Sequence, residues 1–81
     1  NNVRLDTTDR VIRFVAFYTG TTAANSTTTI SVSGMTNDGT WGLNDDAYGN
    51  IYAALAIGSG QFTHTNSSSI SVAYKIQVFK I

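Results

Sequence analysis

Hydrophobic and polar residues alternate along two parts of this chain. In residues 27–33, TTTISVS, Ile30 and Val32 fall on one side and serines on the other. Alternation with a period of two is typical of a half-buried β-strand. The pattern also runs through residues 69–81, SISVAYKIQVFKI. One face of that segment carries Ile70, Val72, Tyr74, Ile76 and Val78. Both segments are predicted to be strands with one face in a core.

Two further segments are apolar on both faces. They are residues 11–19, VIRFVAFYT, and residues 50–57, NIYAALAI. A strand with two apolar faces is predicted to be buried on both. Residues 61–65, QFTHT, could add a short strand, and the Gly-rich segments between these runs are predicted to be loops.

These patterns predict an all-β fold, a small antiparallel β-sandwich of about five to seven strands. The 81 residues suit a single domain, residues 1–81. Residues 1–10, NNVRLDTTDR, are predicted to be a lead-in segment from a longer chain. No window repeats apolar residues at helical spacing over a useful length.

The chain has the character of an internal duplication. The segment NSTTTISVSG at 25–34 is similar to NSSSISVAYK at 66–75, and each follows an apolar strand and a Gly-containing loop. One interpretation is a repeat relating residues 11–33 to residues 50–73. The other is chance similarity between two Ser- and Thr-rich segments.

The composition of the chain argues against several classes of function. Five Lys and Arg balance five acidic residues, so the net charge is zero and nucleic acid is not an expected partner. The chain has no Cys, which excludes disulfides and thiolate zinc sites. No apolar run reaches the length of a membrane span, so membrane insertion is not expected. We predict no cofactor.

Residues for catalysis are few, and we predict that the chain is not an enzyme. The only His is His64, and no G-x-S-x-G motif is present. Asp45 and Asp46 are adjacent, so on an extended chain their side chains point apart. His64 is a weak candidate metal ligand if three copies meet on a threefold axis; the alternative is a surface or hydrogen-bonded His.

The segment GMTNDGTWGLNDDAYGN, residues 34–50, places the only Trp among turn-forming residues. A sugar site needs an aromatic ring and polar groups for the hydroxyls, and a loop can supply both. The candidate ligand-binding residues are Trp41, Asp38, Asp45, Asp46 and Tyr48. The alternative is that Trp41 points inward and anchors the loop in the core.

The amount of apolar surface favours association between copies of the chain. One small sandwich cannot easily cover two strands that are apolar on both faces. The last strand also ends on two apolar residues, Phe79 and Ile81. Phe79 and Ile81 are therefore the candidate oligomer contacts. The alternative is that the chain's own loops cover these faces.

The chain resembles the distal domains of bacteriophage tail fibres and tail spikes. The resemblance lies in a Ser-, Thr-, Asn- and Gly-rich chain without Cys or Pro, in short strands such as TISVSG, and in an apolar last residue. Fibre tips of the T-even type carry a His-x-His metal motif, whereas FTHTN here has a single His.

This resemblance implies an intertwined homotrimer in the virion that recognises a bacterial surface glycan or outer-membrane protein, with no cofactor and no catalysis. The domain could also serve only to hold three chains in register. Two other hypotheses remain open. One is a monomeric carbohydrate-binding module of a secreted, extracellular enzyme, and the other is a ligand-free structural subunit of a capsid or filament.

Overall fold

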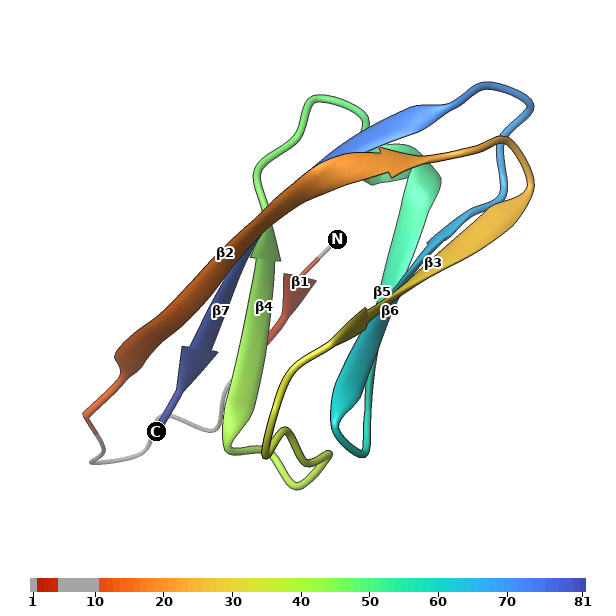
Figure 1. Ribbon diagram of the computed structural model, residues 1–81. Coiled ribbons are helices and arrows are strands. Elements are labelled where there is room, and N and C mark those ends of the chain that lie inside the picture. The colour runs from red at the N-terminus through yellow and green to blue at the C-terminus, as the bar shows by residue number, and fades with distance from the viewer. Residues whose placement is uncertain (1, 5–10) are drawn as a thin grey trace.

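The computed structural model describes residues 2–4 and 11–81, and in them two antiparallel sheets face each other (Figure 1). The four-stranded sheet has the order β1 (Asn2–Val3), β4 (Trp41–Asp45), β7 (Val72–Lys80) and β2 (Arg13–Thr22). The three-stranded sheet has the order β3 (Ser26–Ser31), β6 (Gln61–Asn66) and β5 (Ala53–Gly58). A single 3-10 turn, η1 (Asn50–Tyr52), precedes β5. The predicted antiparallel β-sandwich is confirmed.

The core lies between the two sheets and follows the predicted alternation. Along β7 the buried residues alternate with outward-facing ones, and along β3 the inward Ile30 leads to the buried Val32. Ile70 is exposed because it lies in the loop before β7. The buried apolar cluster consists of Val32, Met35, Trp41, Leu43, Phe62, Tyr74, Ile76 and Val78.

Residues 41–45 form strand β4 and not the predicted loop. It lies between β1 and β7, with Trp41, Leu43 and Asp45 buried. Gly42 and Asn44 are the alternate positions of this strand. The alternation in this strand is hard to recognise in the sequence, because Gly, Asn and Asp favour turns. Backbone pairing with β1 on one side and β7 on the other outweighs that local preference.

The prediction that segments 11–19 and 50–57 are buried on both faces is wrong for the single chain. Strand β2 is an edge strand, and its outward Phe14 and Phe17 are exposed. The second segment is divided between η1 and the edge strand β5, so Ile51 in η1 is exposed as well.

A glycine in β2 makes room for a core tyrosine. Gly20 is the cross-strand partner of Tyr74, and a Cβ at this glycine would come within 2.6 Å of the Tyr74 ring carbon Cζ. The tyrosine ring occupies that space and lies 5.1 Å, centroid to centroid, from the ring of His64. Gly20 thereby sets the position of the aromatic ring beside the only imidazole.

The two similar segments contribute different sets of strands. Residues 11–33 supply β2 to one sheet and β3 to the other. Residues 50–73 supply η1, the β5–β6 hairpin of the three-stranded sheet and the start of β7. Of the lead-in segment, Asn2–Val3 forms β1, while residues 1 and 5–10 lie outside the described residues.

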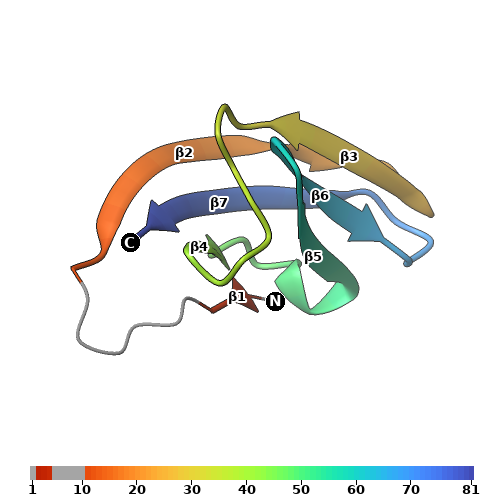
Figure 2. The ribbon, with the colours of Figure 1, turned by 90° about the horizontal axis from the view of Figure 1, so that it is seen from below.

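Strands β2 and β3 are edge strands of their sheets. They lie on the same side of the molecule, as seen in Figure 2. We call the boundary between these two edges the seam. The loop 32–40 leads from β3 to β4, and the carbonyl of Met35 in it accepts a backbone hydrogen bond of 2.8 Å from the amide of Gly60 in the β5–β6 turn. The molecule measures 41 × 22 × 17 Å.

Candidate functional site

A chain of polar side chains crosses the core between the two sheets. His64 of β6 lies with its Nδ1 2.7 Å from the hydroxyl of Thr22 in β2, and that hydroxyl lies 2.7 Å from the hydroxyl of Thr28 in β3. On its other side, Nε2 of His64 is 3.5 Å from Oδ2 of Asp45 in β4. The network joins β2 and β4 of one sheet to β3 and β6 of the other.

The backbone holds the Asp45 carboxylate in place. Its Oδ1 accepts hydrogen bonds of 3.1 Å from the amides of Ala47 and Lys75. The 3.5 Å contact with His64 is longer than an ordinary hydrogen bond, so Asp45 Oδ2 and His64 Nε2 have no hydrogen-bond partner. Burial lowers the pKa of His64 below its ordinary value of 6.5, and the nearby Asp45 charge offsets part of this effect.

The order hydroxyl, imidazole, carboxylate is that of a nucleophilic catalytic triad, but no substrate can reach it. Thr22 is 1%, His64 0% and Asp45 2% exposed. A nucleophile must contact its substrate, so this network links the sheets instead.

Burial of the imidazole also contradicts the prediction that His64 could bind a metal ion on a threefold axis. The His64 ring is fully enclosed within one chain and cannot meet copies of itself. Among the described residues there is no group of three or more His, Cys, Asp or Glu placed to hold a metal ion.

The five candidate ligand-binding residues are not brought together. Trp41 and Asp45 begin and end β4, and both are buried, with Trp41 in the apolar cluster. Asp38 closes a turn by accepting hydrogen bonds from the hydroxyl and the amide of Thr40, which lower the pKa of the Asp38 carboxyl.

The two remaining candidates lie beyond the end of β4. Asp46 accepts a hydrogen bond of 2.8 Å from the side-chain amide of Asn44, and Tyr48 is fully exposed. Asp46 and Tyr48 are therefore near the Asp45 end of the strand and away from the indole.

The candidate oligomer contacts lie at the end of β7. Phe79 is half-buried on the outer face of the four-stranded sheet, and its ring packs edge to face on Phe14, with 5.8 Å between the centroids. Ile81 is also half-buried, and its amide donates a hydrogen bond of 3.0 Å to the carbonyl of Thr40. Neither residue is sealed into the core.

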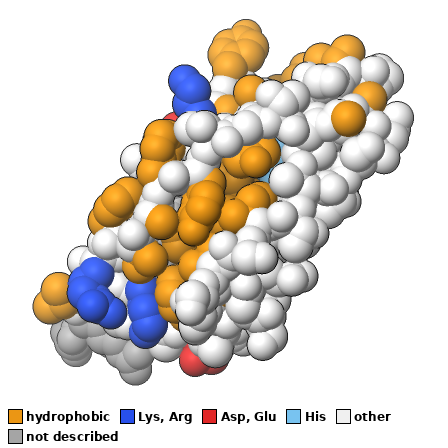
Figure 3. Space-filling model, in the orientation of Figure 1, with side chains coloured by type: hydrophobic (Ala, Val, Ile, Leu, Met, Phe, Trp, Pro, Cys, Tyr) orange, Lys and Arg blue, Asp and Glu red, His pale blue; other side chains and the backbone are white. Residues whose placement is uncertain are grey.

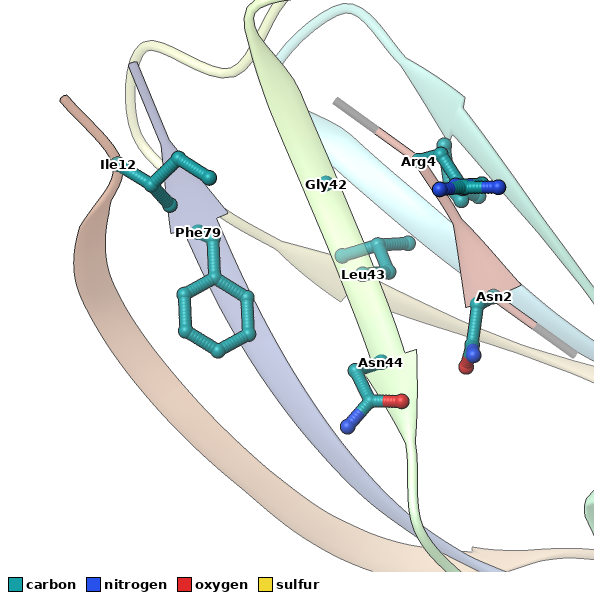
Figure 4. Close-up of a pocket in the computed structure, with 8 residues that line it drawn as sticks. Asn2, Arg4, Ile12, Gly42, Leu43, Asn44 and Phe79 are labelled. Carbon is teal, nitrogen blue, oxygen red and sulfur yellow. The ribbon is translucent and has the colours of Figure 1, made fainter. Parts of the chain in front are cut away.

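A groove of about 310 Å³ runs beside these residues on the outer face (Figure 4). Ile12 and Phe79 lie on one side of β4, and Asn2 and Arg4 lie on the other. Gly42 has no side chain, so the backbone of β4 forms the floor. The groove extends the apolar outer face formed by Phe14 and Phe79.

A second groove, of about 430 Å³, opens at one end of the seam. Figure 3 shows hydrophobic side chains gathered along the seam between β2 and β3, with Lys and Arg side chains at its lower left end. The groove is lined there by Arg13, Lys80, Trp41 and the loop at Ser33 and Gly34. The sequence does not reveal this groove, because its two cations are 67 positions apart in the chain and become neighbours only through β2–β7 pairing.

Within the described ranges the one helical segment is the three-residue η1, so no helix there is long and apolar enough to cross a membrane. Comparison with protein-family models, with curated proteins and with solved structures found no match to this chain.

Proposed function

We propose that this chain is a non-enzymatic tip domain of a phage tail fibre, which assembles as a homotrimer and serves host receptor recognition, trimer capping or both. The observation that carries the proposal is the exposed apolar surface, whose large residues, Ile70 apart, fall into two separate groups. The buried Thr22–His64–Asp45 network supports a structural role for the residues that could otherwise have suggested catalysis.

The first group, which we call the β2 patch, lies at the start of β2. Its members are between 42% and 83% exposed: Val11, Ile12, Phe14, Val15 and Phe17. Strand β2 also has an unpaired edge. Soluble proteins usually cover a long apolar edge strand or interrupt it with charged residues. A second copy of the same chain can cover this strand.

The second group, which we call the η1 patch, lies around η1. It consists of Tyr48, Ile51 and Tyr52, which are between 48% and 103% exposed. The start of β2 and η1 lie well apart in both views (Figures 1 and 2). Contact between two different patches is a head-to-tail interface, and such an interface closes into a ring when the rotation permits. Two separated patches therefore favour a cyclic trimer over a twofold dimer.

A standard protein interface buries roughly 800 Å² on each partner. The total accessible surface of the chain is 4763 Å², so each such patch would take about one sixth of it. A domain of this size gains stability from covering such area, because a small core alone leaves it marginal.

Sedimentation equilibrium tests the assembly. The chain has a mass of 8.7 kDa, so a trimer has a mass of 26.1 kDa, three times that value. We expect the trimer for the native chain, and a single chain for Phe17→Ser and for Tyr52→Ser. Ile70→Ser is the matched control, because Ile70 is 59% exposed but belongs to neither patch. A native mass near 8.7 kDa would refute the proposal.

Mixing the variants distinguishes the ring from a twofold dimer. Phe17→Ser retains an intact η1 patch and Tyr52→Ser retains an intact β2 patch, so one head-to-tail interface can form between them. The mixture should give a species of 17.4 kDa, twice the single-chain mass. A twofold dimer through β2 would instead leave Tyr52→Ser dimeric, which would contradict the ring.

A further inference from the structure

The buried network lies against a second polar group, the side chain of Asn66 at the end of β6. This side chain is fully buried, and its Nδ2 donates hydrogen bonds of 3.2 Å to the carbonyls of Thr22 and Ala23. It also donates one of 2.7 Å to the carbonyl of Ile70. Strands β2 and β6 belong to different sheets. The carboxamide of Asn66 therefore reaches across the sandwich to Thr22, the residue whose hydroxyl contacts His64.

The hydroxyl of Thr22 is placed as a nucleophile. Its oxygen lies 2.7 Å from Nδ1 of His64, and Nε2 on the other side of the ring faces Asp45. Burial lowers the pKa of His64, so the ring is neutral at about pH 7 and carries a single proton. With that proton on Nε2, facing the carboxylate, Nδ1 is free to accept the hydroxyl proton. Thr22 is 1% exposed, so only a group of the same chain can react with it.

The carboxamide of Asn66 is held as an electrophile. Its Oδ1 accepts hydrogen bonds of 3.0 Å from the amide of Ser68 and of 2.7 Å from the hydroxyl of Ser68. Two donors on a carbonyl oxygen stabilise the negative charge that develops there when a nucleophile attacks the carbon. The carbonyls that bind Nδ2 would hold the nitrogen while it gains a proton and leaves.

We propose that Thr22 and Asn66 form an intramolecular ester, which is a covalent link between the two sheets. The Thr22 hydroxyl oxygen forms a bond with Cγ of Asn66, Nδ1 of His64 takes the hydroxyl proton, and the Cγ–Nδ2 bond breaks. The nitrogen leaves with that proton as one molecule of ammonia. The step needs no co-reactant and occurs once in each chain. It does not depend on the proposed function, because it involves a single chain.

A covalent link would compensate for the small size of the domain. The chain has no Cys and therefore no disulfide, and a domain of 81 residues has a small core. Thr22 and Asn66 are 44 positions apart. A bond that closes a loop of this length restricts the unfolded chain as a disulfide does.

The intact mass of the full chain, measured by mass spectrometry under denaturing conditions, tests the link. We expect the native chain to weigh less than its sequence by one ammonia. Thr22→Val has nearly the same shape but no hydroxyl, and His64→Asn lacks the base, so both should keep their full sequence mass. Thr28→Val is the matched control. The Thr28 hydroxyl lies 2.7 Å from that of Thr22 but is not the nucleophile, so this variant should still lose ammonia.

Digestion locates the link. A protease that cleaves at aspartates separates Thr22 from Asn66 in an unlinked chain, because Asp38, Asp45 and Asp46 lie between them. The ester would hold the two fragments together until hydroxylamine cleaves it. If Thr22→Val does not fold, these linked fragments of the native chain decide.

Two results would overturn the proposal. A loss of ammonia that persists in Thr22→Val would come from an asparagine that cyclises on its own backbone. A native chain that keeps its full sequence mass after prolonged incubation in the folded state would show that Asn66 holds the two loops by hydrogen bonds alone.

Discussion

Lowering the pH from about 7.5 to about 5.5 should destabilise this domain through one buried imidazole. His64 is fully buried, and burial lowers its pKa below the ordinary value of 6.5. In the unfolded chain the ring titrates near 6.5. Below that pH the unfolded state therefore binds more protons than the folded state. The contribution of His64 to stability is complete above about pH 6.5 and is lost as the pH falls toward the folded pKa.

The size of the effect follows from the proton uptake. One proton gives a slope of at most about 1.4 kcal/mol per pH unit, and about pH 5.5 is one unit below the unfolded pKa. The loss is thus up to about 1.4 kcal/mol. For a domain of 60–100 residues this corresponds to a fall in Tm of roughly 6–11 °C. The pKa of Asp38 is lowered from 3.8, so its contribution is lost only at lower pH.

Thermal unfolding followed by circular dichroism measures this fall, at one fixed protein concentration because association would also shift Tm. His64→Asn cannot titrate in this range, so its Tm should change much less between the two pH values. An equal fall in His64→Asn, or no fall in the native chain, would refute the reasoning. If His64→Asn does not fold, proton NMR of the native His64 ring decides, since a measured pKa of 6.5 or above contradicts the argument.

Two further substitutions test the packing around the same network. Asp45→Ala leaves two backbone amides without their acceptor and removes the carboxylate beside the His64 ring, and it should cost about 3–5 kcal/mol in urea denaturation. The exposed Asp46→Ala should change stability by less than about 0.5 kcal/mol, and equal losses in the two variants would contradict the role of Asp45. Gly20→Ala should cost about 1–3 kcal/mol, because its Cβ would overlap the Tyr74 ring. Gly58→Ala is its control, with the nearest atom 3.6 Å away, and a stable Gly20→Ala would show that the ring can move without cost.

The predicted cost of Asp45→Ala is large compared with the total free energy of unfolding of the domain. At roughly 0.05–0.15 kcal/mol per residue, 81 residues give about 4–12 kcal/mol of stability in total. A loss of about 3–5 kcal/mol would then remove a large share of it. A variant that fails to fold when expressed would agree with this margin, and urea denaturation of Asp45→Asn, which keeps the shape, would give the measurable value.

The strand pattern was predictable wherever apolar and polar residues alternate without turn-forming residues. Segments 27–33 and 69–81 correspond to β3 and β7, and the inward positions within both strands were identified, whereas Ile70 lies in the loop before β7 and is exposed. Strand β4 was missed because Gly42 and Asn44 occupy its outward positions, and the local preference of those residues is for turns. The homotrimer, the receptor and the fibre-tip function remain predictions.

The candidate sites are formed by residues that lie far apart in the sequence and meet only in the folded chain. Thr22 and His64 are 42 positions apart, yet they share a hydrogen bond, and Arg13 and Lys80 become cross-strand neighbours through β2–β7 pairing. A usable signal did exist for the buried network. His64 lies at the inward parity of QFTHTN, between Phe62 and Asn66, which are both fully buried.

The sequence alone determined that this chain forms strands, that they are antiparallel and short, and which faces of β3 and β7 point inward. Those properties follow from alternation between neighbouring residues, which is a local pattern. Only the tertiary structure decided which strands are edges, which polar groups meet inside the core and where the two cations converge. Each of these depends on which strands pair, and pairing is set by the total burial and hydrogen bonding of the whole sandwich.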